Sequence, residues 1–173
     1  MLFVFLIAAL CIGADQLTKY LAVAALYPDG SVDVIPGILR FTYVENRGAA
    51  FGSLSDERWI FLVFSTVLII VLIGYTVWKK PAGWLERISI GLLIGGGIGN
   101  MIDRTLMGYV VDFVDFRLIN FAVFNVADIF VCVGCGLMFL WLFKFAEFDD
   151  EKKPEKKSAV TESAEESDDA SDR

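Results

Sequence analysis

The sequence contains no histidine, which removes the commonest general base and the commonest metal ligand from its available chemistry. Three cysteines in 173 residues do not indicate a disulfide framework. No basic stripe with interleaved aromatic residues is present, so nucleic-acid binding has no support. If the chain does hydrolytic chemistry, carboxylates are the natural candidates to carry it, and such chemistry requires neither a metal nor a cofactor.

The cysteines allow one alternative to carboxylate chemistry, a redox or metal site. Cys132 and Cys135 form a C-x-x-C, a spacing found in redox and metal sites. They lie within the apolar stretch FVCVGCGLMF, without a second cysteine pair or a histidine. We therefore interpret them, like Cys11, as small packing residues compatible with a lipid environment.

Apolar residues are abundant and lie in long blocks. Hydrophobic residues make up 56% of the chain, and its mean hydropathy is +0.60. Four segments are long enough to cross a bilayer, which needs about 20 predominantly apolar residues: 2–26, 58–78, 88–108 and 122–145. The first resembles a cleaved signal peptide, but it lacks a basic beginning and its apolar character resumes after Lys19. We expect it to be a retained span.

The net charge of −7 comes largely from the C-terminal end, because residues 147–173 hold 11 of the 22 acidic and 5 of the 15 basic residues. Residues 148–173 lack apolar periodicity and are predicted to be a disordered, charged, cytoplasmic tail, following a transmembrane domain at 1–147. Basic residues gather in the connection 79–87 and after the fourth span. This bias places both termini in the cytoplasm, although three arginines near the first outer segment oppose it: Arg40, Arg47 and Arg58.

The outer segment 28–57 has more structure than a linker. Residues 39–43 alternate apolar and polar β-formers, and turn residues at 28–30 and 36–37 bracket them. The predicted fold is mainly α: a four-transmembrane-helix bundle with a small extracytoplasmic β-sheet on the outer membrane surface.

Helix rise places the polar residues of the spans in one layer near the outer face. Their calculated positions are about 21 Å along the first span, about 18–24 Å along the third and within ~10 Å of the start of the fourth. The residues concerned are Asp15, Lys19, Asn100, Asp103, Arg104, Asn125 and Asp128. Asp112 follows the third span directly, and Asn46 can reach the same layer from the outer segment.

A carboxylate at membrane depth is costly and usually marks a functional site. For the neighbouring pairs Asp15–Lys19 and Asp103–Arg104, mutual neutralisation that holds helices together is the favoured interpretation. For Asp112 and Asp128 we favour a chemical role over a structural one, because no basic residue is close to Asp128 in the sequence.

Gly91, Gly95 and Gly99 repeat at four-residue spacing. A phosphate-binding loop would need a preceding strand and a Lys-Ser/Thr pair, and both are missing. The repeat favours a face of small residues on which helices pack closely.

Five blocks together resemble the lipoprotein signal peptidase (signal peptidase II) family of bacterial membrane aspartic peptidases. They are DQLTK at 15–19, NRGAAFG at 46–52, GGGIGNMIDR at 95–104, VVDF at 110–113 and FNVAD at 124–128. The resemblance covers the chain except its tail. It implies that Asp112 and Asp128 are the catalytic pair, with Asp112 preferred over Asp115 of the repeated VDFVDF. The implied supporting or substrate-binding residues are Asp15, Lys19, Asn46, Gly48, Asn100, Arg104 and Asn125.

The resemblance also implies the substrate and the location. The family cleaves the signal peptide of diacylglyceryl-modified prolipoproteins just before the lipidated cysteine, in the bacterial cytoplasmic (inner) membrane, and is inhibited by globomycin. We expect the same here, with an active site near the outer face, contact with membrane lipid, no cofactor and a monomeric enzyme. Two facing aspartates share one proton and activate a water, and the sequence leaves open which of them is the base.

Two other classes of function are considered. Buried carboxylates could serve a small proton-coupled carrier, although four spans without an inverted repeat argue against one. A membrane scaffold that recruits partners through its charged tail is the third hypothesis, and it predicts that removing the tail abolishes function.

Overall fold

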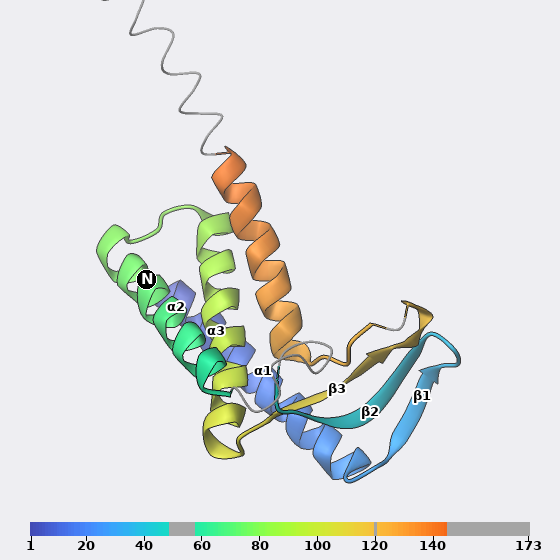
Figure 1. Ribbon diagram of the computed structural model, residues 1–173. Helices are drawn as coiled ribbons and strands as arrows, with labels where there is room; N and C mark the ends of the chain where they lie inside the picture. Colours follow the sequence, from blue (N-terminus) through green and yellow to red (C-terminus); the bar gives the residue numbers. More distant parts are fainter. Residues whose placement is uncertain (49–57, 120, 145–173) are drawn as a thin grey trace, which may run out of the picture. The chain divides into compact units, whose positions relative to one another are not determined.

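The computed structural model describes residues 1–48, 58–119 and 121–144, and it is mainly helical with one small sheet (Figure 1). Its elements are α1 (Leu2–Leu26), β1 (Ser31–Ile35), β2 (Leu39–Asn46), α2 (Arg58–Lys79), α3 (Trp84–Leu106), β3 (Val110–Phe116), the 3-10 turn η2 (Arg117–Ile119) and a last helix, Val126–Lys144. Residues 1–137 form one compact unit that holds the sheet and the candidate site. The predicted tail and residues 49–57 of the outer segment lie outside the described residues.

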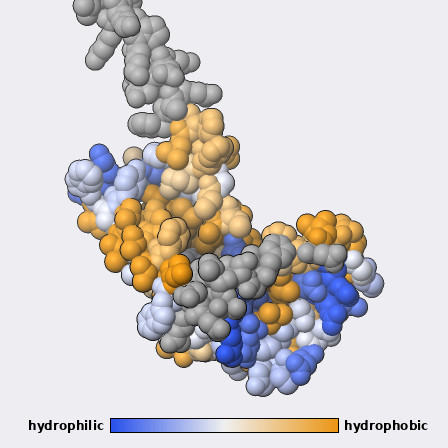
Figure 2. Space-filling model, in the orientation of Figure 1, coloured by the Kyte–Doolittle hydropathy of each residue, from blue (hydrophilic) through white to orange (hydrophobic). Residues whose placement is uncertain are grey.

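Within the described ranges, three helical segments are long and apolar enough to cross a membrane: Leu2–Leu26, Leu62–Lys79 and Val126–Lys144. α3 is not among them, because its glycines and its charged ends lower its hydropathy. The predicted first span therefore has the bounds of α1, whereas the prediction of four spans stays a prediction. Apolar side chains cover much of the helical surface in Figure 2, as expected where helices face lipid.

α3 packs closely against α1 and against the last helix because glycines form these two contact faces. A Cβ added at Gly95 would lie 2.5 Å from Cys11 Cβ and 2.9 Å from the Ala8 carbonyl oxygen of α1. On the other side, a Cβ at Gly96 would lie 2.6 Å from the Ala127 carbonyl oxygen of the last helix. The predicted small-residue packing face is confirmed, and it brings α1 and the last helix onto α3.

The sheet is antiparallel in the order β1-β2-β3. β2 confirms the strand predicted at residues 39–43 and extends it to Asn46. β3 was not predicted. It pairs Val44 of β2 with Asp112, and Val114 forms a bridge with Phe124 just before the last helix. Asp112 is thereby placed beside the start of the last helix, where Asp128 lies.

Candidate active site

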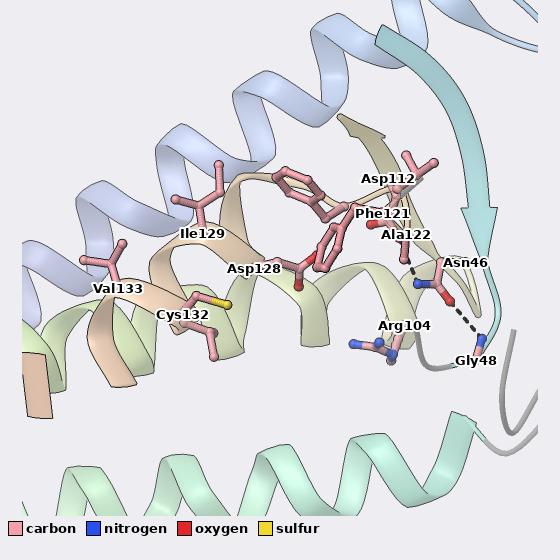
Figure 3. A pocket seen from close by; sticks show the side chains of 13 residues that line it. Asn46, Gly48, Arg104, Asp112, Phe121, Ala122, Asp128, Ile129, Cys132 and Val133 are labelled. Carbon is pink, nitrogen blue, oxygen red and sulfur yellow. Dashed lines mark hydrogen bonds between the residues drawn. The ribbon is translucent and has the colours of Figure 1, made fainter. Parts of the chain in front are cut away.

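Asp112 of β3 and Asp128 of the last helix line one pocket of about 490 Å³ (Figure 3). Asp112 is only 1% exposed, and Asp128 is partly buried. The other polar side chains of the lining belong to Asn46 and Arg104. Apolar side chains from residues 121–133 form the remaining wall, and Cys132 lines it as a free thiol.

The first turn of the last helix determines how Asp128 is held. The side-chain oxygen of Asn125 accepts the Asp128 N–H at 3.0 Å, and Asp128 Oδ2 accepts the Asn125 N–H at 3.2 Å. This reciprocal arrangement is a capping box, which satisfies two of the backbone donors that every helix start leaves unpaired. The first turn also places Asp128 at the positive end of the helix dipole.

Three asparagine amides present donors to the two carboxylates, and an independent donor orients each amide. Asn46 Oδ1 accepts the Gly48 N–H at 3.0 Å, so its NH₂ group faces Asp112 Oδ2 at 2.8 Å. The oxygen of Asn125 is occupied by the Asp128 N–H, so its NH₂ group donates to Asp112 Oδ1 at 2.6 Å. An amide has one acceptor and two donors on opposite sides, and these contacts leave a single orientation for both residues.

Asn100 of α3 completes the set. Its Oδ1 accepts from Lys19 Nζ at 2.9 Å and from the Asn125 amide at 3.0 Å, which turns its NH₂ group to Asp128 Oδ1 at 2.7 Å. All four oxygens of the two carboxylates therefore accept a hydrogen bond from a donor that the fold holds in place. The remaining lone pairs are the ones available to a proton, a water or a substrate.

The electrostatics of Asp112 follow from its position in the sheet. Burial raises the pKa of Asp112 to about 6; the Asn46 hydrogen bond opposes this shift, and the negative charge of Asp128 reinforces it. One pKa unit corresponds to about 1.4 kcal/mol between the two protonation states. Asp112 thus binds a proton more readily than an ordinary aspartate does, as expected for one member of a pair that shares a proton.

Lys19 contacts this hydrogen-bond network through Asn100 and has 3% of its surface exposed. Its Nζ is 2.8 Å from Asp15 Oδ2 and 2.8 Å from Asp103 Oδ2. The predicted Asp15–Lys19 pair is confirmed. Asp103, which was expected to be neutralised by the adjacent Arg104, forms an ion pair with Lys19 across the α1–α3 interface.

All nine predicted site residues lie in the pocket lining or in the hydrogen-bond network connected to it: Asp15, Lys19, Asn46, Gly48, Asn100, Arg104, Asp112, Asn125 and Asp128. Asp115 does not line the pocket. In the sheet it lies opposite Arg40 of β2, and its Oδ2 is 4.0 Å from Arg117 Nε.

Sequence reasoning missed Gln16, which was not singled out. It placed Asp103 in the polar layer but paired it with the adjacent Arg104. The Gln16 amide donates to Asp103 Oδ1 at 2.9 Å and to the Gly99 carbonyl at 3.3 Å. The three-residue spacing of Asn100 and Asp103 on α3 was the available signal for Asp103.

Comparisons with known proteins agree on one family. The model of the family described as signal peptidase (SPase) II matches residues 7–144. The chain is 48% identical over 139 residues to the lipoprotein signal peptidase of Caldanaerobacter subterraneus subsp. tengcongensis, covering 80% of this chain and 94% of that one. It is 39% identical over 147 residues to the lipoprotein signal peptidase of Halothermothrix orenii, covering 85% and 99%.

Solved structures show the same likeness in three dimensions. A bacterial membrane enzyme solved by the in meso method at 2.3 Å superposes with a TM-score of 0.76 at 34% identity, covering 82% of this chain and 87% of the other. A second such structure, at 1.9 Å, gives a TM-score of 0.74 at 34% identity over 82% and 92% of the two chains.

Proposed function

The chain belongs to the signal peptidase II family, and we propose that Asp112 and Asp128 are its catalytic pair. It is a membrane peptidase that removes the signal peptide from bacterial prolipoproteins. One observation carries the proposal of an aspartic mechanism: two carboxylates line the same pocket, and each of their oxygens accepts an oriented donor.

The surroundings of the two carboxylates favour different roles for them. Asp128 lies at the positive end of a helix, and the Asn125 N–H and the Asn100 amide donate to its two oxygens. Asp112 lies in a strand, is buried and has a raised pKa. Asp112 accordingly holds the shared proton, and Asp128 is the ionised base.

The reaction then follows general acid–base chemistry. Asp128 removes a proton from a water molecule as the water oxygen bonds to the scissile carbonyl carbon, and Asp112 gives its proton to the carbonyl oxygen. A tetrahedral intermediate forms. Its C–N bond breaks while Asp128 passes the proton to the leaving nitrogen, and one hydroxyl of the intermediate returns its proton to Asp112 as the carboxylic acid forms. Arg104, which lines the pocket, is suited to position a backbone carbonyl of the substrate.

The substrate is a prolipoprotein with a diacylglyceryl group on the cysteine that follows the cleaved bond. The apolar wall at residues 121–133 offers a surface for the signal peptide beside the dyad, and the apolar helices suit a site in contact with lipid. We place the enzyme in the cytoplasmic membrane as a monomer with four spans, cytoplasmic termini and a site near the outer face. Neither the family nor the pocket supports the carrier hypothesis.

Separate Asp112→Asn and Asp128→Asn substitutions test the pair. Each removes one carboxylate while keeping the volume of the side chain, and each is expected to lower kcat by about 10⁴-fold. The assay is cleavage of a purified lipidated prolipoprotein in detergent, with folding checked by thermal unfolding. Asp115→Asn is the matched control, because Asp115 lies in the same strand outside the pocket. Full activity in either dyad variant, or equal loss in the control, contradicts the assignment.

A further inference from the structure

The residue before each catalytic aspartate is hydrogen-bonded to another aspartate. The N–H of Ala127, which precedes Asp128, donates to Asp15 Oδ1 at 2.9 Å. The N–H of Val111, which precedes Asp112, donates to Asp103 Oδ2 at 3.2 Å. Both hydrogen bonds are buried, and both link a catalytic element to a helix, α1 or α3, that carries no catalytic carboxylate.

Lys19 links Asp15 and Asp103, the two side chains that anchor these backbone N–H groups. Its Nζ lies 2.8 Å from a carboxylate oxygen of Asp15 and 2.8 Å from one of Asp103, and none of the three side chains is more than 4% exposed. Charged hydrogen bonds of this kind are short and strong, and removing one partner leaves an uncompensated buried charge. The distance between the two anchored backbone N–H groups is therefore tightly restrained.

We propose that Asp15, Lys19 and Asp103 (the Lys19 triad) position the catalytic pair by setting the separation of the backbones at Ala127 and Val111. The inference rests on the proposed function, because it assigns Asp112 and Asp128 to catalysis. Each anchor acts one residue from a reacting carboxylate, in a helix start on one side and a strand on the other. Lys19 also orients Asn100, whose amide donates to Asp128.

The close packing of α3 on α1 makes the triad possible. A Cβ at position 99 would lie 2.6 Å from Asp15 Oδ2, so a residue larger than glycine there would displace this carboxylate. None of the three triad residues lines the pocket. Damage to the triad is therefore expected to lower kcat and to leave KM unchanged, because the substrate-binding surface stays intact.

The two carboxylate oxygens of Asp15 divide the donors differently from those of Asp103. Asp15 Oδ1 accepts from Ala127, and its Oδ2 accepts from Lys19 and Gln16. An amide at position 15 must therefore turn its NH₂ group towards the Ala127 N–H or towards the Lys19 ammonium, and both are donors. Asp15→Asn thus breaks one link of the triad in either orientation.

An amide at position 103 can keep both of its contacts within the triad. Asp103 Oδ2 accepts from both Val111 and Lys19, whereas Oδ1 accepts from Gln16. The oxygen of an asparagine can keep the first two contacts, and its NH₂ group then faces Gln16. If the Gln16 amide turns to accept it, the cost is the Gln16 hydrogen bonds to Asp15 Oδ2 and the Gly99 carbonyl, whereas the links among Asp15, Lys19 and Asp103 remain. Asp15→Asn and Asp103→Asn remove the same charge at the same distance from Lys19, yet only the first breaks the triad.

The experiment compares these two variants by steady-state cleavage of a lipidated prolipoprotein. Asp15→Asn is expected to lower kcat by about 100-fold, the loss typical of a misplacement of about 1 Å, with KM unchanged. Asp103→Asn is expected to lower kcat by at most about fivefold. Thr18→Val is the control on α1, because the Thr18 hydroxyl donates to the backbone carbonyl oxygens of Ala14 and Asp15 in its own helix, each at 2.9 Å. The kcat of this variant should equal that of the wild type.

Equal kcat losses for the two variants, or a loss that appears in KM, overturn the proposal. If Asp15→Asn does not fold, position 103 decides alone: Asp103→Ala should lose about 100-fold in kcat and Asp103→Asn should recover most of it. Equal kcat for alanine and asparagine overturns the proposal as well. Failure of the proposed function looks different, because the wild type would then not cleave, or Asp112→Asn would remain active.

Discussion

Asn125 contacts both carboxylates of the proposed catalytic pair, and Asn125→Asp separates its two roles. An aspartate at this position still caps the helix, because Asp and Asn are equally good N-cap residues. It loses the NH₂ group that donates to Asp112 Oδ1 at 2.6 Å and places a third carboxylate against the pair. We therefore expect the helix cap to be retained, whereas the third buried carboxylate should lower the thermal stability and shift the catalytic titration.

The sign and size of the shift follow from the contacts of Asp112. The Asn125 hydrogen bond lowers the pKa of this carboxyl, which burial and the charge of Asp128 raise to about 6. A hydrogen bond to a charged group is worth about 1.5–3 kcal/mol, which corresponds to roughly 1–2 pKa units. Removing it raises the pKa of Asp112, and the added negative charge acts in the same direction.

The measurement is kcat/KM for lipidated prolipoprotein as a function of pH, which reports the titration of the free enzyme. Because Asp112 must carry the proton, the wild-type activity should fall as pH rises through about 6. In Asn125→Asp this descending limb should move roughly 1–2 units higher, with a lower maximal rate. Asn125→Ala is the matched comparison: it loses the cap and should cost about 1 kcal/mol of stability. A limb that stays in place or moves to lower pH refutes the assignment of the proton to Asp112.

Three further predictions concern packing, inhibition and the tail. Gly95→Ala should lower the free energy of unfolding by about 1–3 kcal/mol, because the added Cβ would lie 2.5 Å from Cys11 Cβ. Gly13→Ala is the control: its Cβ would meet nothing within 4 Å, so this variant should be neutral or stabilised by up to about 1 kcal/mol. Thermal unfolding measures both. Globomycin should raise the apparent KM for the lipidated substrate and leave kcat unchanged; a lowered kcat at saturating substrate would show that it binds elsewhere. Deleting residues 148–173 should leave the cleavage rate unchanged, because the residues of the proposed catalytic network that the structure describes all precede them. Loss of cleavage would favour the scaffold hypothesis.

Local properties of the chain determined its membrane helices and its catalytic candidates. The bounds of α1 could be predicted because length and hydropathy belong to a continuous segment. Asp112 and Asp128 could be singled out because a carboxylate in apolar surroundings is costly whatever its partners are. The close-packing face of α3 was visible because the glycine spacing matches the helical repeat.

The tertiary structure decided how these residues are connected. β3 escaped prediction because VVDFVDF alternates poorly, and it becomes a strand only by pairing with β2, about 70 residues earlier in the chain. The partners that fix the site are equally distant: Asn46 bonds Asp112 across 66 residues, and Ala127 bonds Asp15 across 112. Sequence alone names the carboxylates, but hydrogen bonds depend on direction and separation, and only the packing of α1, α3, β3 and the last helix supplies these.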